Sequence, residues 1–185
     1  MIKNYVKLLL FILVFFSLSS CFVVSVNGLQ TFQEHQKNSI LEEKNQINMH
    51  LNQWHKDVAE SNFEAYFGKM SQNSIFIGTD ASENWTVQQF KDFSKPYFDQ
   101  KKTWDFKPLE RHIYFSSKED IAWFDELLDT WMGVCRGSGV LSKINGEWKI
   151  EHYVLSVVIP NDDIKKVIEI KKEKDSKIIQ NFKSN

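Results

Sequence analysis

The sequence predicts an α+β fold in which helices come first and a mostly antiparallel sheet follows. Three segments before residue 99 carry apolar side chains at helical spacing. Four later segments are rich in β-branched and aromatic residues and are separated by short turns. The 185 residues, of which 42% are hydrophobic, are enough to bury the core of one domain. We therefore expect a single domain of three N-terminal helices packed on a sheet.

The charge balance excludes one large class of partner. The chain has 23 Lys and Arg residues against 24 Asp and Glu residues, so its formal net charge is −1. Proteins that bind nucleic acids obtain most of their affinity by neutralising phosphates with a basic surface. We therefore expect no nucleic-acid partner. Two cysteines allow one disulfide at most, so the fold must depend on its core.

Residues 1–28 have the pattern of a leader for export: two lysines, a long apolar run and no acidic residue. Leu18-Ser19-Ser20-Cys21 is similar to the lipobox of bacterial lipoproteins, which makes Cys21 the candidate for lipidation. Cleavage after Gly28 and an uncleaved membrane anchor are the alternatives. Each places the domain outside the cytoplasm, either periplasmic, anchored to the membrane through the leader or a lipid, or secreted.

The helices are expected from Thr31 to about Glu60, from Phe63 to Met70, and from Thr86 to Phe98. His50 and His55 lie five residues apart on the first of them. A pair of metal-binding histidines on a helix requires a spacing of four. We therefore interpret both histidines as solvated or boundary residues.

A first strand is predicted at Ser74–Gly78, followed by a turn that contains Asp80 and Glu83. Thr86 or Asn84 is expected to cap the helix after this turn, because short polar side chains accept hydrogen bonds from the first free backbone amides.

Four strands then follow in an antiparallel meander: Trp104–Ser116, Ile121–Thr130, Cys135–Ile144 and Trp148–Ile159. Asn145-Gly146 favours a two-residue type I′ turn, because both residues tolerate a positive φ. The domain is expected to span residues 31–160, and residues 161–185 form a charged tail that is partly helical.

Several short sequences support a family resemblance: Gly78–Thr86 (GTDASENWT), Ala122–Glu126 (AWFDE), Arg136–Leu141 (RGSGVL) and Trp148–Ile150 (WKI). With the order of elements, they resemble a bacterial branch of the SnoaL-like domains in the nuclear transport factor 2-like superfamily. The resemblance runs from about residue 46 to residue 161. It implies a cone formed by three helices and a curved sheet. Because the superfamily includes isomerases, cyclases, dehydratases, ligand binders and association domains, the fold does not select among these functions.

Hairpin turns predict which strand residues face each other. If Asn145-Gly146 and residues 117–120 form the turns of two hairpins, four pairs follow: Leu141–Ile150, Gly139–His152, His112–Asp125 and Arg111–Glu126. The connection from Asp129 to Val134 is longer. There we assume a register that sets Glu126 opposite Arg136 and Trp123 opposite Gly139. A slip of one residue would move Arg136 beside Asp125.

One face of the sheet is the preferred pocket in these registers, and it carries His112, Tyr114, Trp123, Asp125, Gly137, Gly139, Ile150 and His152. Asp125 is the predicted acid or base, with His112 or His152 as its proton partner. Tyr114, Trp123, Gly137 and Gly139 are predicted to line the pocket, because glycine lets a ligand approach the backbone closely.

The opposite face carries Arg111, Ile113, Phe124, Glu126, Arg136, Ser138 and Tyr153. Arg111, Glu126 and Arg136 are expected to form a ladder across three strands, with Tyr153 on the same face. This ladder is either a structural row of ion pairs or a site for a carboxylate ligand. Because Asp125 and Glu126 are adjacent on a strand, only one of them can face the interior of the cone.

The remaining candidates are expected to be structural. Trp54, Trp85, Trp123 and Trp148 are predicted core residues, and Cys135 is a predicted buried strand residue. No motif for a metal, a phosphate or a dinucleotide is found in the sequence, so no metal and no cofactor is expected.

Two functions remain open. In the first, the domain binds a small organic molecule in its cone and performs acid–base chemistry of the isomerase, cyclase or dehydratase type. In the second, it is a non-catalytic ligand-binding or association domain that forms a homodimer through its sheet.

Overall fold

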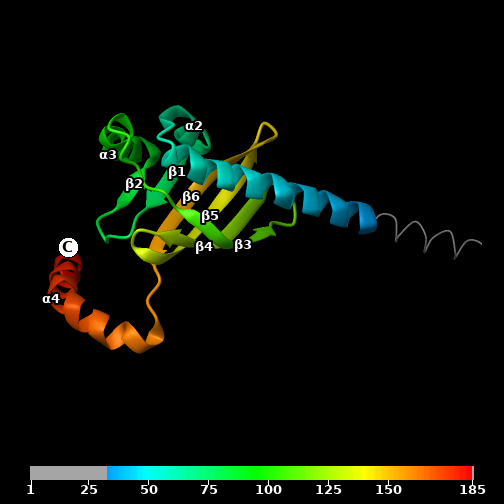
Figure 1. Cartoon of the computed structure of the whole chain (residues 1–185). Helices are drawn as coiled ribbons and strands as arrows, with labels where there is room; N and C mark the ends of the chain where they lie inside the picture. The colour runs from blue at the N-terminus through cyan, green and yellow to red at the C-terminus, as the bar shows by residue number, and fades with distance from the viewer. Residues whose placement is uncertain (1–32, 185) are drawn as a thin grey trace, which may run out of the picture. The chain divides into compact units, whose positions relative to one another are not determined.

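A computed structural model describes residues 33–184 and is shown in Figure 1. The predicted leader, with Cys21 and both cleavage sites, lies outside the described residues. The chain divides into one unit that ends at Met49 and another that begins at His50. The described part of the first unit, residues 33–49, is helical.

The three predicted helices are confirmed. Residues 50–59 are helical, α2 covers Phe63–Gly68, and α3 covers Val87–Asp99. Thr86 caps α3: its hydroxyl accepts a hydrogen bond from the amide of Gln89, whose side chain accepts one from the amide of Thr86. This reciprocal capping box fixes where the helix begins.

The described residues form a six-stranded sheet with the order β2-β1-β6-β5-β4-β3. The strands are β1 (Met70–Ile77), β2 (Asn84–Thr86), β3 (Lys107–Phe115), β4 (Ile121–Thr130), β5 (Gly133–Ile144) and β6 (Glu147–Val157). β1 pairs with β6 in parallel, and the other neighbours are antiparallel. The predicted meander is therefore confirmed, with one parallel pair and a short additional strand.

The sheet is curved, and it has one buried and one exposed face (Figure 1). α3 packs against β1 and β2, and α2 packs against α3. Phe124 and Tyr153 on the inner face are buried, whereas the side chain of Trp123 is 46% exposed on the outer face. The prediction that Trp123 is a core residue is therefore wrong. Trp54, Trp148 and the free thiol of Cys135 are buried as expected.

Two of the predicted hairpin registers agree with the structure near their turns. β3 and β4 pair as expected, with Arg111 opposite Glu126 and His112 opposite Asp125. Leu141 lies opposite Ile150, next to the predicted turn at residues 145–146. Farther from this turn, an irregularity between Val140 and Leu141 shifts the pairing by one residue. Gly139 therefore faces Tyr153 and not His152.

The assumed register between β4 and β5 is wrong by one residue. Glu126 lies opposite Gly137, and Phe124 lies opposite Gly139. Paired residues share a face, so both glycines belong to the buried face and not to the face of Asp125. Arg136 pairs with Leu127 and moves to the outer face, which means that the predicted ladder of two arginines around Glu126 does not form. Arg136 does not lie beside Asp125, because β5 is shifted by one residue in the direction opposite to the shift that would bring these two residues together.

The C-terminal tail is more regular than the sequence predicts. A short 3-10 helix, η1 (Asn161–Asp163), is followed by α4 (Ile164–Lys183). Among the helices of residues 33–184, none combines the length and the apolar character that a membrane span requires.

Candidate functional site

Glu126 is the centre of a buried polar network on the inner face of the sheet. Its side chain projects from β4, and the residue is 1% exposed. Its Oε1 lies 2.8 Å from Nε2 of His55 and accepts a hydrogen bond of 2.9 Å from the hydroxyl of Tyr153. Its Oε2 accepts two hydrogen bonds from Arg111, from Nε at 2.9 Å and from Nη2 at 2.7 Å. Each carboxylate oxygen thus has two nitrogen or oxygen atoms within hydrogen-bond distance, which matches its two lone pairs.

The network keeps Glu126 ionised in spite of its burial. Burial by itself would raise the pKa of Glu126, but the hydrogen bond and the charge of His55, together with Arg111, outweigh this effect and lower the pKa from its ordinary value of 4.5. Burial and the neighbouring carboxylate raise the pKa of Tyr153, so its hydroxyl stays protonated and donates. Because both oxygens are occupied, the carboxylate joins the helix of residues 50–59 to β3, β4 and β6.

His55 is a member of this network that the sequence interpretation missed. It is 4% exposed, so the prediction that it is solvated or at the boundary is wrong. A signal was present, because His55 lies four residues after Leu51 and three before Val58, both of which are completely buried. His50 is partly exposed, and burial, followed by the charge of Lys69, lowers its pKa to about 4.

Gly137 provides the space that the network occupies. A Cβ atom at this position would lie 2.1 Å from the hydroxyl of Tyr153 and 2.9 Å from Oε1 of Glu126. These distances are too short for any side chain. The space beside Gly137 is therefore filled by the side chains of Tyr153 and Glu126 and not by a ligand, which the sequence interpretation expected there.

The face that the sequence favoured as a pocket is the exposed outer face. His112 and Asp125 are brought together there, with Nδ1 and Oδ1 3.2 Å apart, and both side chains are more than one third exposed. The rings of Tyr114 and Trp123 stack beside them at 6.0 Å. His152 lies opposite Val140 on the same face. The acid–base role of Asp125, His112 and His152 stays a prediction.

A cavity of about 150 Å³ is lined by none of these candidates. Seven of its twelve lining residues are aromatic: Phe76, Trp85, Phe90, Phe93, Trp104, Phe106 and Trp131. Phe76 and Phe90 are buried and stack at 3.9 Å, whereas Trp131 is 81% exposed. The cavity therefore has a closed aromatic floor and an open rim. A wider hollow of about 320 Å³ is lined by Asp80, Ala81, Ser82, Ile178, Asn181 and Phe182, with one aromatic ring among them.

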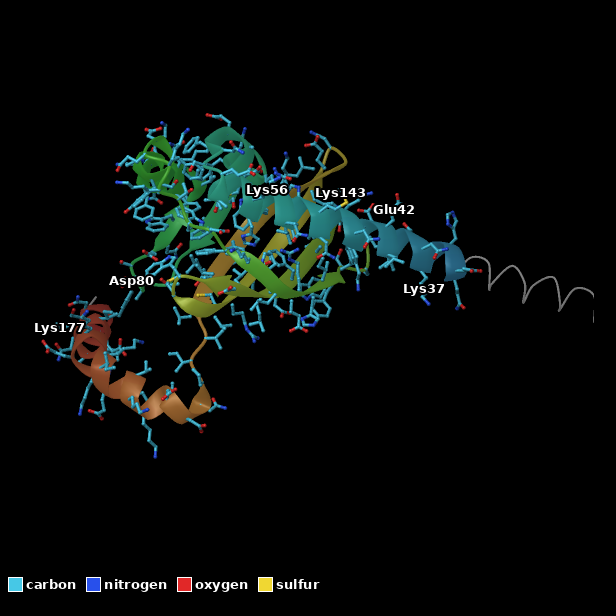
Figure 2. The ribbon with its side chains drawn as sticks, in the orientation of Figure 1. Lys37, Glu42, Lys56, Asp80, Lys143 and Lys177 are labelled. Atoms are coloured by element: carbon cyan, nitrogen blue, oxygen red, sulfur yellow. The ribbon has the colours of Figure 1, made fainter. Side chains whose placement is uncertain are left out.

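The loop between β1 and β2 places Glu83 in the lining of the aromatic cavity. Asp80, which Figure 2 labels, lies in the same loop, and its backbone amide donates to Oε2 of Glu83 at 3.1 Å. The amide of Gly78 donates to the backbone carbonyl of Glu83 at 2.9 Å. A Cβ at Gly78 would lie 2.1 Å from Oε2 of Glu83, so the glycine lets the carboxylate rest on the backbone. The predicted turn is thus confirmed.

The charged side chains that line the aromatic cavity are of one sign. Among its described lining residues, Glu83 is acidic and none is Lys, Arg or His. Within residues 33–184, no group of three or more His, Cys, Asp or Glu side chains has an arrangement that could hold a metal ion. The chemistry available in the cavity is therefore that of aromatic rings and one carboxylate.

Solved structures with the same fold include proteins of differently named activities. One from Novosphingobium aromaticivorans, provisionally named a scytalone dehydratase, is 12% identical, with a TM-score of 0.56 over 66% of this chain and 89% of that one. A cystatin-like-fold domain of unknown function from Nostoc punctiforme is 11% identical, with a TM-score of 0.56 over 78% and 98%. A domain from Exiguobacterium sibiricum, provisionally named a calcium/calmodulin-dependent kinase II association domain, is 18% identical, with a TM-score of 0.51 over 63% and 93%.

At these identities, the solved structures show the fold alone. No curated protein matches the chain. The model of the SnoaL-like domain family matches residues 47–160, which include the helix of residues 50–59, both hairpins and the aromatic cavity. The chain belongs to the SnoaL-like domain family.

Proposed function

We propose that the protein binds a small organic molecule in the aromatic cavity. The observation that carries this proposal is the cavity of about 150 Å³ with seven aromatic lining residues. An apolar cavity of this volume holds a molecule about the size of benzene. Exposed apolar surface around a hollow is typical of binding sites, and Trp131 provides such a surface at the rim.

Binding is favoured over catalysis by the distribution of titratable groups. Glu126 has both oxygens occupied by partners, and Asp125 lies on the outer face. Of the lining residues that the structure describes, Glu83 alone has a carboxyl or imidazole side chain. Isomerases and dehydratases commonly need a group that removes a proton and another that returns one. One carboxylate among rings is better suited to holding a ligand.

Trp131→Ala is expected to weaken the binding of neutral aromatic probes such as benzyl alcohol and toluene. One ring contact contributes about 0.5–1.5 kcal/mol, which corresponds to about a 2- to 10-fold higher Kd. Saturation-transfer NMR titrations measure the change. Trp123→Ala is the matched control, because Trp123 is an exposed tryptophan that does not line the cavity. Equal weakening in both variants would contradict the proposal, and so would a wild type that binds no small organic probe saturably.

The second candidate function is self-association through the outer face of the sheet. Tyr114, Ile121 and Trp123 are each more than 40% exposed on this face, and the two rings stack on each other. Large exposed apolar residues that cluster in this way are typical of interfaces.

We expect the domain to sediment as a homodimer and the Trp123→Glu variant to sediment as a monomer. A carboxylate at the centre of an apolar interface would lose its water without gaining a partner. Analytical ultracentrifugation distinguishes the two states. Trp131→Glu is the control with the same charge change outside this face, and a monomeric wild type would exclude the association.

We also propose that the chain is exported and anchored through a lipid on Cys21, which rests on the leader pattern of residues 1–28. After expression in a bacterium, the full chain is expected in the membrane fraction and the Cys21→Ser variant outside it. If both are soluble, cleavage after Gly28 replaces the proposal. If both remain in the membrane fraction, an uncleaved anchor replaces it.

A further inference from the structure

We propose that the ligand of the aromatic cavity is a small organic ammonium cation, held by the carboxylate of Glu83 and by the faces of the surrounding rings. This inference rests on the proposed function, since it names the chemical class of the molecule that the cavity binds. Three observations support it: the sign of the charge in the cavity lining, the lack of an ion-pair partner for Glu83 among the described residues, and the arrangement of the rings.

The lining favours a positive ligand. Aromatic rings present a negative face, and an ammonium group within about 6 Å of a ring centroid is attracted to it. Seven aromatic residues and one carboxylate line the cavity, and none of the described lining residues is basic. An anionic ligand would meet repulsion from Glu83 and from the ring faces. Electrostatics therefore selects against a carboxylate or phosphate ligand.

Glu83 is held in place but not neutralised. Its Oε2 accepts a hydrogen bond from the amide of Asp80 at 3.1 Å and rests over Gly78. Within residues 33–184, no lysine, arginine or histidine forms an ion pair with Glu83. Glu126 differs in this respect, because Arg111 neutralises it.

A ligand that covers Glu83 removes water from a carboxylate that forms no ion pair with the described residues. A neutral ligand would leave this loss uncompensated, whereas an ammonium group replaces the water with an opposite charge. The same carboxylate therefore disfavours neutral ligands and favours cationic ones. This preference is the property that an experiment can measure.

Several of the lining rings stack on one another, whereas Trp131 does not. Trp85 stacks on Phe93 at 4.5 Å, and its plane lies within 5° of the plane of Phe90. Trp131, at the turn between β4 and β5, makes no ring contact with any described residue. Its indole is thus available to cover a ligand from the open side. Tryptophan is the aromatic residue that binds cations best.

Choline and its neutral isostere 3,3-dimethylbutan-1-ol provide the test, because they differ in charge but hardly in shape. Isothermal titration at low salt is expected to show choline binding about tenfold or more tightly than the neutral alcohol. In Glu83→Gln, the ratio of the two Kd values is expected to fall several-fold, to the smaller preference that the ring faces alone provide. The amide oxygen of glutamine can still accept the hydrogen bond from Asp80, so the loop keeps its anchor.

Asp92→Asn is the matched control, since it removes one negative charge from an exposed position on α3 that does not line the cavity. It is expected to keep the preference for choline. Higher salt is expected to reduce this preference in the wild type, because ions screen an exposed charge pair.

The inference is overturned if choline binds no better than the neutral alcohol, if it does not bind, or if Glu83→Gln keeps the preference. Benzyl alcohol in the same titrations separates this failure from failure of the proposed function. If benzyl alcohol binds and choline has no advantage, the cavity binds neutral molecules and only the cation inference fails. If none of the three molecules binds, the proposed function fails as well.

Discussion

The Glu126→Gln variant is expected to lose about 3–5 kcal/mol of unfolding free energy, because it breaks a buried ion pair on one side only. The side chain of Arg111 is 5% exposed, so the substitution leaves its guanidinium buried without its counter-charge. Its Nη1 also donates to the amide oxygen of Asn52 at 2.8 Å, but this oxygen carries no charge. Glutamine also places an NH₂ donor where Glu126 has an acceptor oxygen. This NH₂ group would point at hydrogen-bond donors of His55, Tyr153 or Arg111, so these groups lose their hydrogen bonds.

The loss of unfolding free energy in Glu126→Gln is expected to depend on pH. A carboxyl group whose pKa is lowered by folding contributes stability that is fully present above its unfolded pKa and is lost as the pH falls through the folded value. Glu126 has such a lowered pKa. The difference in unfolding free energy between wild type and Glu126→Gln is therefore expected to be largest near neutral pH and to shrink below about pH 4.5.

Urea unfolding of Asp125→Asn provides the matched control, because it makes the same chemical change at the next residue of the strand. The side chain of Asp125 is 37% exposed and contacts His112, whose side chain is also exposed. A surface substitution of this kind changes the unfolding free energy by about 0.5 kcal/mol or less. Similar losses in both variants would show that Glu126 is not the stabilising centre that the geometry indicates.

Gly139→Ala is expected to destabilise the domain by about 1–3 kcal/mol, because the inner face has no room for a methyl group there. A Cβ at Gly139 would lie 2.5 Å from the backbone carbonyl of His152 and 2.7 Å from the ring of Phe124. The carbonyl belongs to the neighbouring strand β6 and cannot rotate away as a side chain can. Relief of the clash requires β5 and β6 to separate.

Gly68→Ala is the control for the intrinsic effect of replacing glycine. Gly68 is the last residue of α2, and a Cβ there would meet no atom within 4 Å. The substitution removes backbone freedom from the unfolded chain, so it is expected to be neutral or to stabilise by up to about 1 kcal/mol. Chemical denaturation of both variants measures the contrast. A Gly139→Ala protein as stable as wild type would contradict the described pairing of β4, β5 and β6.

Features encoded by neighbouring residues could be predicted from the sequence. Asn145 and Gly146 have the positive φ values of 52° and 85° that their turn requires, and the pairs close to this turn follow. Thr86 caps its helix through residues three positions away. In each case the interacting groups are so close in the chain that loop closure leaves few alternatives.

The sequence alone did not determine which face of the sheet is buried. The pairing of β4 with β5 differs by one residue from the assumed register, and a change of one residue exchanges the faces of Gly137 and Arg136. The irregularity in the pairing of β5 with β6 adds a second change, because it places Tyr153 opposite Gly139 on the inner face. Neither register shift changes the alternation of residues along a single strand, so the alternation in the sequence cannot reveal how two strands pair.

The predicted order of helices followed by a mostly antiparallel sheet is thus confirmed, and so is the pairing of Arg111 with Glu126. Only the tertiary structure decided that this pair is buried, that His55 completes it, and that the aromatic cavity with Glu83 lies elsewhere. Local patterns determine elements and turns through contacts of a few residues. Burial depends on which face the helices cover, and that choice is made by packing between residues as far apart in the chain as His55 and Glu126.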